Sequence, residues 1–177
     1  MKKILTLLLV MAMVMTGFTA CGSGNEGEAG GNAAGSVEGT PAEIIEKIYE
    51  QYPVADLPLG TIEIDLADAD AVKMFTGLDS AEKITEAAAF EPMMGSMAFS
   101  MVLVRVTEGA DSKAVAESMK SGIDTRKWIC VEANDLKVAG FGDVVMLIMV
   151  NSDSGMTAQS FVDAFAKIAG FDPAFVI

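Results

Sequence analysis

Two long apolar segments constrain the fold more than any other feature of this sequence. Met97 to Val106 contains one charged residue, Arg105, and Val144 to Val150 contains none. Apolar runs of this length without polar alternation are typical of strands that are buried on both faces of a sheet. We therefore expect both segments to be central strands, with other elements covering the two faces of their sheet.

Each apolar segment belongs to a pattern that occurs twice. A plausible partner strand precedes it, and a polar turn and an amphipathic helix follow it. The first copy has strands over Ile84–Phe90 and Met97–Val106 and a helix over Ser112–Ile123; the second has strands over Leu136–Phe141 and Val144–Val150, joined at Gly142-Asp143, and a helix over Thr157–Ala169. The repeated strand-strand-helix unit predicts an α+β fold, in which a four-stranded antiparallel sheet carries two helices on one face.

Two further helices are expected before the repeat. Thr40-Pro41-Ala42-Glu43 is a capping box with proline at the first helical position, and Pro53 ends that helix. A short strand is expected near Ile62–Leu66, and Asp68 caps a helix that ends at Gly77. These N-terminal helices are predicted to cover the remaining face of the sheet.

The first twenty residues have the layout of a signal peptide. Two lysines precede an uncharged apolar run, and small residues lead from there to Cys21. Thr19-Ala20-Cys21 resembles the lipobox that lipoprotein signal peptidase recognises, although Phe18 stands where Leu is usual. Conventional secretion and a retained membrane-spanning helix are the alternatives, but such a helix needs about 20 apolar residues. We expect cleavage before Cys21 and a lipid anchor on it.

The predicted organisation is a leader over residues 1–20, a lipidated Cys21 with a flexible tether to residue 39, and one domain over 40–177. The tether is rich in Gly, Ala, Ser, Asn and Glu, and Val37 is its only large apolar residue. Such a segment buries too little to offset its ordering entropy. The domain is thus expected at the outer face of the cell membrane, to which the lipid binds it.

Charge and residue types restrict the possible functions. Removal of residues 1–20 takes two lysines and no acidic residue, so the net charge changes from −13 to −15. This charge argues against a nucleic-acid partner. The sequence contains no histidine, which removes the commonest general base and the usual serine and cysteine triads. No cofactor is implied. Cys130, with Cys21 lipidated, has no internal disulfide partner, and we expect it to be a small core residue.

Four features in this order resemble the domain-of-unknown-function 4358 family of Firmicute lipoproteins. They are the leader with its Gly-rich tether, Phe75-Thr76-Gly77-Leu78-Asp79, Glu91-Pro92-Met93-Met94, and Gly142-Asp143 before the second apolar strand. The resemblance covers residues 68–169, and Phe75 stands where a tyrosine is expected. It implies the same cellular address and fold, and it brings no catalytic residue because the family has no established activity.

Two short motifs carry possible chemistry. Ser80-Ala81-Glu82-Lys83 fits the S-x-x-K motif of penicillin-binding proteins, but the companion signatures are absent and a turn or helix cap is the better interpretation. Met93, Met94, Met97 and Met101 could bind copper(I) through their thioethers, although methionines near a buried strand usually fill the core.

Two other groups are weak candidates for binding. Asp65, Asp68 and Asp70 could hold calcium, but they equally suit a strand end and a helix N-terminus. Arg126, Lys127 and Trp128 form the one basic and aromatic group on an acidic chain, and such residues anchor protein interfaces. Trp128 could also close the core.

These observations favour a non-catalytic interaction module that binds an envelope protein. A small lipoprotein that binds a ligand or metal ion is the first alternative. An envelope hydrolase that uses carboxylates alone is the second, and it would need two such groups facing each other across a cleft, about 5–10 Å apart. No enzyme is expected, because no complete catalytic set is present.

Overall fold

The computed structural model describes residues 36–54, 58–93 and 97–177, so the leader and Cys21 lie outside the described residues. Within these ranges six strands form one antiparallel sheet in the order β1-β2-β3-β5-β4-β6. The strands are β1 (Leu59–Glu63), β2 (Ile84–Pro92), β3 (Phe99–Val106), β4 (Asp135–Phe141), β5 (Val144–Val150) and β6 (Phe175–Val176). The α+β class is therefore confirmed, but the sheet has two strands more than predicted.

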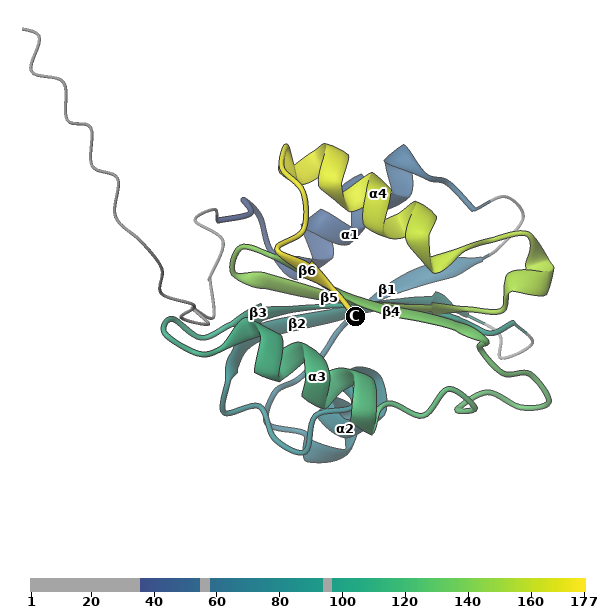
Figure 1. Cartoon of the computed structure of the whole chain (residues 1–177). Coiled ribbons are helices and arrows are strands. Elements are labelled where there is room, and N and C mark those ends of the chain that lie inside the picture. The colour runs from purple at the N-terminus through teal and green to yellow at the C-terminus, as the bar shows by residue number, and fades with distance from the viewer. Residues whose placement is uncertain (1–35, 55–57, 94–96) are drawn as a thin grey trace, which may run out of the picture.

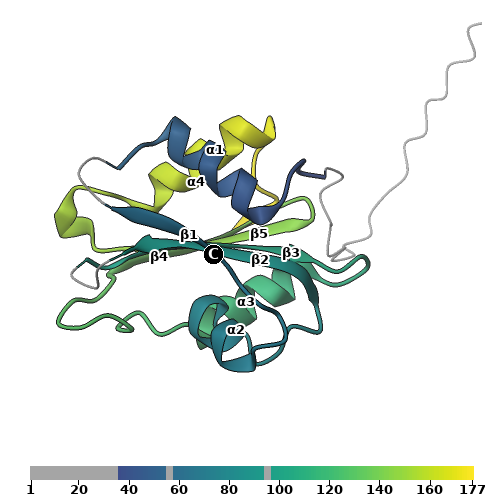
Figure 2. The same ribbon diagram turned by 180° about the vertical axis from the view of Figure 1, so that it is seen from behind.

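Helices cover both faces of the sheet and make a three-layered molecule (Figures 1 and 2). The helices are α1 (Pro41–Gln51), α2 (Ala69–Thr76), α3 (Ser112–Gly122) and α4 (Ala158–Ala169), with a short 3-10 turn at Ser152–Ser154. One face packs against α1 and α4, and the other against α2 and α3.

The two apolar strands occupy the centre of the sheet, as predicted. In β3, Met101 and Leu103 point toward α1 and α4, while Val102 and Val104 point toward α2 and α3. All seven residues of β5 are buried. The unbroken apolar sequence follows from this position, because both faces of a central strand lie against helices.

The two helices of the repeat lie on opposite faces, so the prediction that they share one face is wrong. The N-terminal helices α1 and α2 also lie on different faces, so the prediction that both cover the remaining face is wrong as well. The α3 connection joins β3 to the parallel strand β4, and the α4 connection joins β5 to the parallel strand β6. Both connections cross one strand in the same direction along the sheet, but β3 and β5 are antiparallel. Two crossovers of the same hand must then place their helices on opposite faces.

Local signals set the helix ends. The Thr40 side chain accepts from the Glu43 amide, and the Glu43 carboxylate accepts from the Thr40 amide at 2.9 Å, which confirms the capping box. Asp68 caps α2, and Gly77 ends it in the left-handed conformation at φ 78°.

The C-terminal ends of α2 and α3 approach each other closely through glycine. A Cβ atom on Gly122 would lie 2.0 Å from the carbonyl oxygen of Gly77, a distance that no side chain can occupy. Gly122 thus lets the two helices of this face pack together.

Candidate functional site

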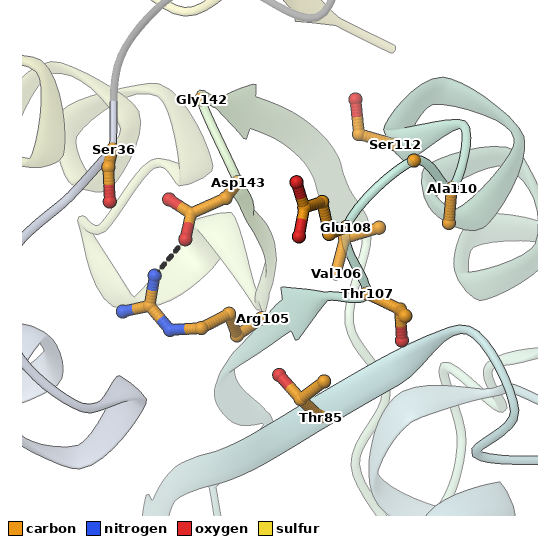
Figure 3. A pocket seen from close by; sticks show the side chains of 11 residues that line it. Ser36, Thr85, Arg105, Val106, Thr107, Glu108, Ala110, Ser112, Gly142 and Asp143 are labelled. Carbon is orange, nitrogen blue, oxygen red and sulfur yellow. Dashed lines mark hydrogen bonds and ion pairs between the residues drawn. The ribbon is translucent and has the colours of Figure 1, made fainter.

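An open groove of about 540 Å³ lies at the end of the sheet where β3 ends and β4 turns into β5 (Figure 3). We call it the Arg105 groove. Its lining includes Ser36, Thr85, Arg105, Glu108, Ser112 and Asp143. These residues come from the segment before α1, from β2 and β3, from the turn into α3 and from the β4–β5 turn. The groove therefore joins segments that are far apart in the sequence.

Arg105, the one charge in the apolar strand β3, organises one wall of this groove. Its guanidinium forms an ion pair with Asp143, and its Nε lies 3.5 Å from Oε2 of Glu86. Its Nη2 donates to the backbone carbonyls of Val37, at 3.1 Å, and of Gly39. We call this set of contacts the Arg105 clamp. The clamp explains why a strand that is otherwise apolar contains an arginine.

The clamp holds the segment before α1 against the domain. The Val37 amide donates to Oδ1 of Asp143 at 3.1 Å, and the Val37 side chain, 5% exposed, belongs to the core on the face of the sheet that α1 and α4 cover. The described part of the domain thus begins before Thr40. Two sequence signals pointed to this arrangement, the single charge in β3 and the single large apolar residue of the tether, but the sequence does not connect them.

The chemistry available in the Arg105 groove is limited. Two carboxylates, Glu108 and Asp143, line it together with several hydroxyls. Asp143 already accepts from Arg105 and from the Val37 amide. It is therefore not free to take a proton from a substrate, as a carboxylate hydrolase would require. The exposed Glu108 and the hydroxyls can accept and donate hydrogen bonds to a polar ligand.

A second polar constellation lies inside the opposite end of the sheet. Lys127 forms an ion pair with Glu91, and their side chains are 10% and 14% exposed. The Ser100 hydroxyl donates to Glu91 at 2.6 Å and lies 3.3 Å from the Lys127 Nζ. The Nζ also lies 5.3 Å from the ring centroid of Phe75 and 5.5 Å from that of Trp128. Lys127 thus fastens the loop before β4 to β2 and β3.

Burial lowers the pKa of Lys127 from its ordinary value of 10.5, and the nearby Glu91 and Asp124 carboxylates oppose this change. A serine beside a lysine of lowered pKa resembles a Ser-Lys nucleophile pair. Ser100, however, is fully buried and donates its proton to Glu91. We therefore interpret the three residues as a structural network.

Two of the three predicted calcium ligands have separate local roles, and the third, Asp70, lies in the first turn of α2. Asp68 accepts from the amides of Asp70 and Ala71 at the start of α2, and Asp65 accepts from the amide of Ala67. Among the residues that the structure describes, no group of three or more His, Cys, Asp or Glu side chains is placed to hold a metal ion. The geometry corresponds to the helix-capping alternative.

Only one of the three predicted interface residues is freely accessible. The Arg126 side chain is 77% exposed and lies 3.5 Å from Glu132. Trp128 is partly buried and packs against the core beneath α2 and α3, while Lys127 is held by Glu91. The sequence placed these three residues together, but it did not show that Lys127 and Trp128 lie against each other and are partly buried while Arg126 is exposed.

Cys130 is exposed and has a positive φ of 66°, so the prediction that it is a core residue is wrong. It lies in an irregular loop, although the neighbouring residues are apolar. Of the four methionines, Met93 is exposed, Met101 is fully buried in the core and Met97 packs against that core; Met94 lies outside the described residues. Ser80 is exposed in the turn before β2, as the turn interpretation predicts.

Comparisons with protein-family models, with curated proteins and with solved structures found no match to the chain. Within the described ranges, no helix combines the length and apolar character that crossing a membrane requires.

Proposed function

We propose that this chain is a lipoprotein anchored through Cys21 to the outer face of the cell membrane, and that its domain is a non-catalytic interaction module for an envelope protein. The observation that supports this proposal most directly is the Arg105 clamp. It fixes the point at which the chain enters the domain, beside the β4–β5 turn and the end of β3. A module that is tethered at a fixed point presents its other surfaces to partners in a reproducible orientation.

The use of the polar side chains inside the domain also supports a module without catalysis. Lys127, Glu91 and Ser100 satisfy one another, and Arg105 is occupied by carboxylates and backbone carbonyls. In the described ranges no buried side-chain nitrogen or oxygen lacks a hydrogen-bond partner. Reactive groups with a perturbed pKa are usually held in a cleft, whereas Lys127, whose pKa burial lowers, is packed against Glu91 and Ser100. We also propose that the chain is a member of the domain-of-unknown-function 4358 family, on the resemblance of its motifs.

Two measurements on intact cells test the proposal. The first compares the wild-type chain with Cys21→Ser: we expect the wild type in the membrane fraction and labelled by palmitate, and the variant unlabelled and released. The second places a photo-crosslinking residue at Glu108, Ile62 or Ile129, which are exposed on different sides of the domain. We expect a reproducible, light-dependent adduct of one size from one of these positions. Absence of an adduct from all three would contradict an interaction module.

A second candidate function, the binding of a small polar ligand, is favoured by the Arg105 groove. A ligand at 100 times its dissociation constant would stabilise the domain by about 2.7 kcal/mol. A thermal-shift screen with cell-wall fragments and divalent cations, repeated with Glu108→Gln, tests it. A rise in melting temperature in the wild type that is lost in Glu108→Gln would favour the ligand-binding function over the interaction module.

A further inference from the structure

Among the residues that the structure describes, no strand pairs with the outer edge of β1. The Ile64 amide donates to the Ala87 carbonyl at 3.0 Å, and the Met93 amide donates to the Pro58 carbonyl at 2.8 Å. In an antiparallel pair, residues alternate between bonding to the partner strand and pointing away from it. The register of β1 with β2 then directs the N–H and C=O groups of Leu59, Thr61 and Glu63 away from the sheet.

This edge lacks most of the features that usually protect edge strands. Natural edges carry lysine, proline or a bulge, or they are very short. β1 has five residues with neither lysine nor proline, its register with β2 is continuous, and Glu63 is its only charge. The opposite edge is different, because β6 has only two residues. β1 therefore offers the longer template for an additional strand.

The surroundings of the edge are acidic. Glu63 is followed by Asp65, Asp68 and Asp70, all exposed, and no basic residue occurs between positions 63 and 70. The hydrogen bonds that Asp65 and Asp68 accept from the backbone leave their negative charges in place. A strand that pairs here meets a negative potential, so a basic segment is favoured. A second copy of this acidic chain is disfavoured for the same reason.

A hollow of about 300 Å³ begins where β1 ends. It is lined by residues of the start of α1, of β2 and of the end of β1, among them Thr40, Pro41, Glu63, Ile64, Leu66 and Glu86. In strand addition, the main-chain hydrogen bonds give affinity, and pockets for alternate side chains give specificity. The open edge and the hollow supply these two components next to each other.

We propose that the β1 edge binds an extended, basic segment of a partner protein as an added strand, with one side chain of that segment in the hollow. This inference deepens the proposed interaction module and rests on it. The partner is a polypeptide segment in which lysine or arginine alternates with apolar residues.

The test uses a pair of substitutions at Thr61. Thr61→Pro removes an amide that points away from β2, so it blocks an added strand and leaves the bonds between β1 and β2 in place. Thr61→Val changes the same side chain and keeps the amide. Protection of the Gly60 and Ile62 amides against hydrogen exchange, measured by NMR, reports whether β1 remains paired in each variant.

The probe is a nine-residue peptide that alternates lysine with valine, added to the full ¹⁵N-labelled chain in detergent micelles. Two matched peptides have glutamate in place of lysine or proline in place of valine. We expect saturable binding of the lysine-valine peptide alone, with new protection of the Leu59, Thr61 and Glu63 amides. The affinity of Thr61→Pro for this peptide should be at least about tenfold lower than that of Thr61→Val. Removing one main-chain bond and adding a steric block accounts for that change.

Three results would overturn the inference. They are equal binding by the two Thr61 variants, equal binding of the glutamate peptide, and self-association of the chain that Thr61→Pro abolishes. The last would identify a second copy as the occupant. If cells yield crosslinks from Ile129 or Glu108 that Thr61→Pro does not change, the interaction module stands and the edge is not its site. If no position crosslinks, the module itself fails.

Discussion

Lys127 and Arg105 are charged side chains that are largely removed from solvent, and each is held by a carboxylate. Lys127 pairs with Glu91 at one end of the sheet, and Arg105 pairs with Asp143 at the other. Taking a charge out of water costs several kcal/mol, so the loss of one partner leaves a costly unpaired charge. Replacing one member of either pair should therefore lower the free energy of unfolding more than replacing both members by neutral residues.

Substitution of Lys127 by Met should lower the free energy of unfolding by about 3–5 kcal/mol, because Glu91 stays buried without its cation. The double variant Glu91→Gln with Lys127→Met should recover most of this loss, since the amide oxygen still accepts from Ser100. Urea denaturation of the two single variants and the double variant measures the coupling. Additive effects would show that the pair contributes little.

The stability of the domain should depend on Lys127 at alkaline pH. Because burial lowers the pKa of Lys127 in the folded state below 10.5, the unfolded chain binds more protons than the folded one between the two pKa values. The contribution of Lys127 to the free energy of unfolding is smallest below the folded-state pKa and rises with pH up to about 10.5. The difference between wild type and Lys127→Met, measured by denaturation across this range, should grow with pH. A difference independent of pH would contradict the assignment.

The sequence showed which residues are grouped along the chain, but it did not predict which of them are buried and which are exposed. Arg126, Lys127 and Trp128 form one basic and aromatic group in the sequence, yet only Arg126 is largely exposed. Cys130 has apolar neighbours in the sequence, but its loop leaves the sheet and exposes it. The direction of a side chain in an irregular loop depends on contacts made elsewhere, such as that of Lys127 with Glu91.

Helices and strands with strong local signals were predicted well. The bounds of β5 agree with the apolar segment Val144–Val150, and α4, which spans Ala158–Ala169, agrees with the predicted helix Thr157–Ala169 to within one residue. The bounds of β1 were less clear, because a short edge strand has weak periodicity, and β6 was missed since two residues carry no pattern. Local sequence patterns thus identified the central strands and the helices. The bounds of the edge strands are set by their pairing with neighbouring strands, which local patterns do not contain.

The contact between α2 and α3 gives a prediction for helix packing. Gly122→Ala should destabilise the domain by about 1–3 kcal/mol, because the new methyl group would overlap the Gly77 carbonyl and force the helices apart. The exposed neighbour Ser121→Ala serves as the control and should change the melting temperature little. A wild-type melting temperature for Gly122→Ala would show that the two helix ends can separate without cost.

At the scale of the whole molecule, the repeated sequence pattern does not produce a repeated structure. The two strand-strand-helix units are alike in order, but their helices lie on opposite faces, since β3 and β5 run in opposite directions. The prediction of two helices on one face did not include the strand order. The strand order, which local patterns do not contain, decides between the two arrangements.

The Arg105 clamp should control the order of the segment before α1. In Arg105→Gln, the Val37 and Gly39 carbonyls lose their charged donor, and Asp143 loses its cation. We expect the Val37 amide to exchange with solvent at least about tenfold faster, in line with the loss of a hydrogen bond of about 1.4 kcal/mol. Hydrogen exchange measured by NMR provides the readout, and Lys137→Gln, in β4, provides a matched control of charge. Unchanged exchange at Val37 would mean that core packing alone fixes the segment.

The position of the clamp also has a mechanical consequence. A pull on the chain from its N-terminal side reaches Val37 and its partners Arg105 and Asp143 before it reaches the first turn of α1. The ion pair and its hydrogen bonds therefore carry the load before the core does, and they are the first contacts to open. A brief load on the chain before Val37 would open these few contacts first, and the central strands would stay in register as long as the clamp carries the load.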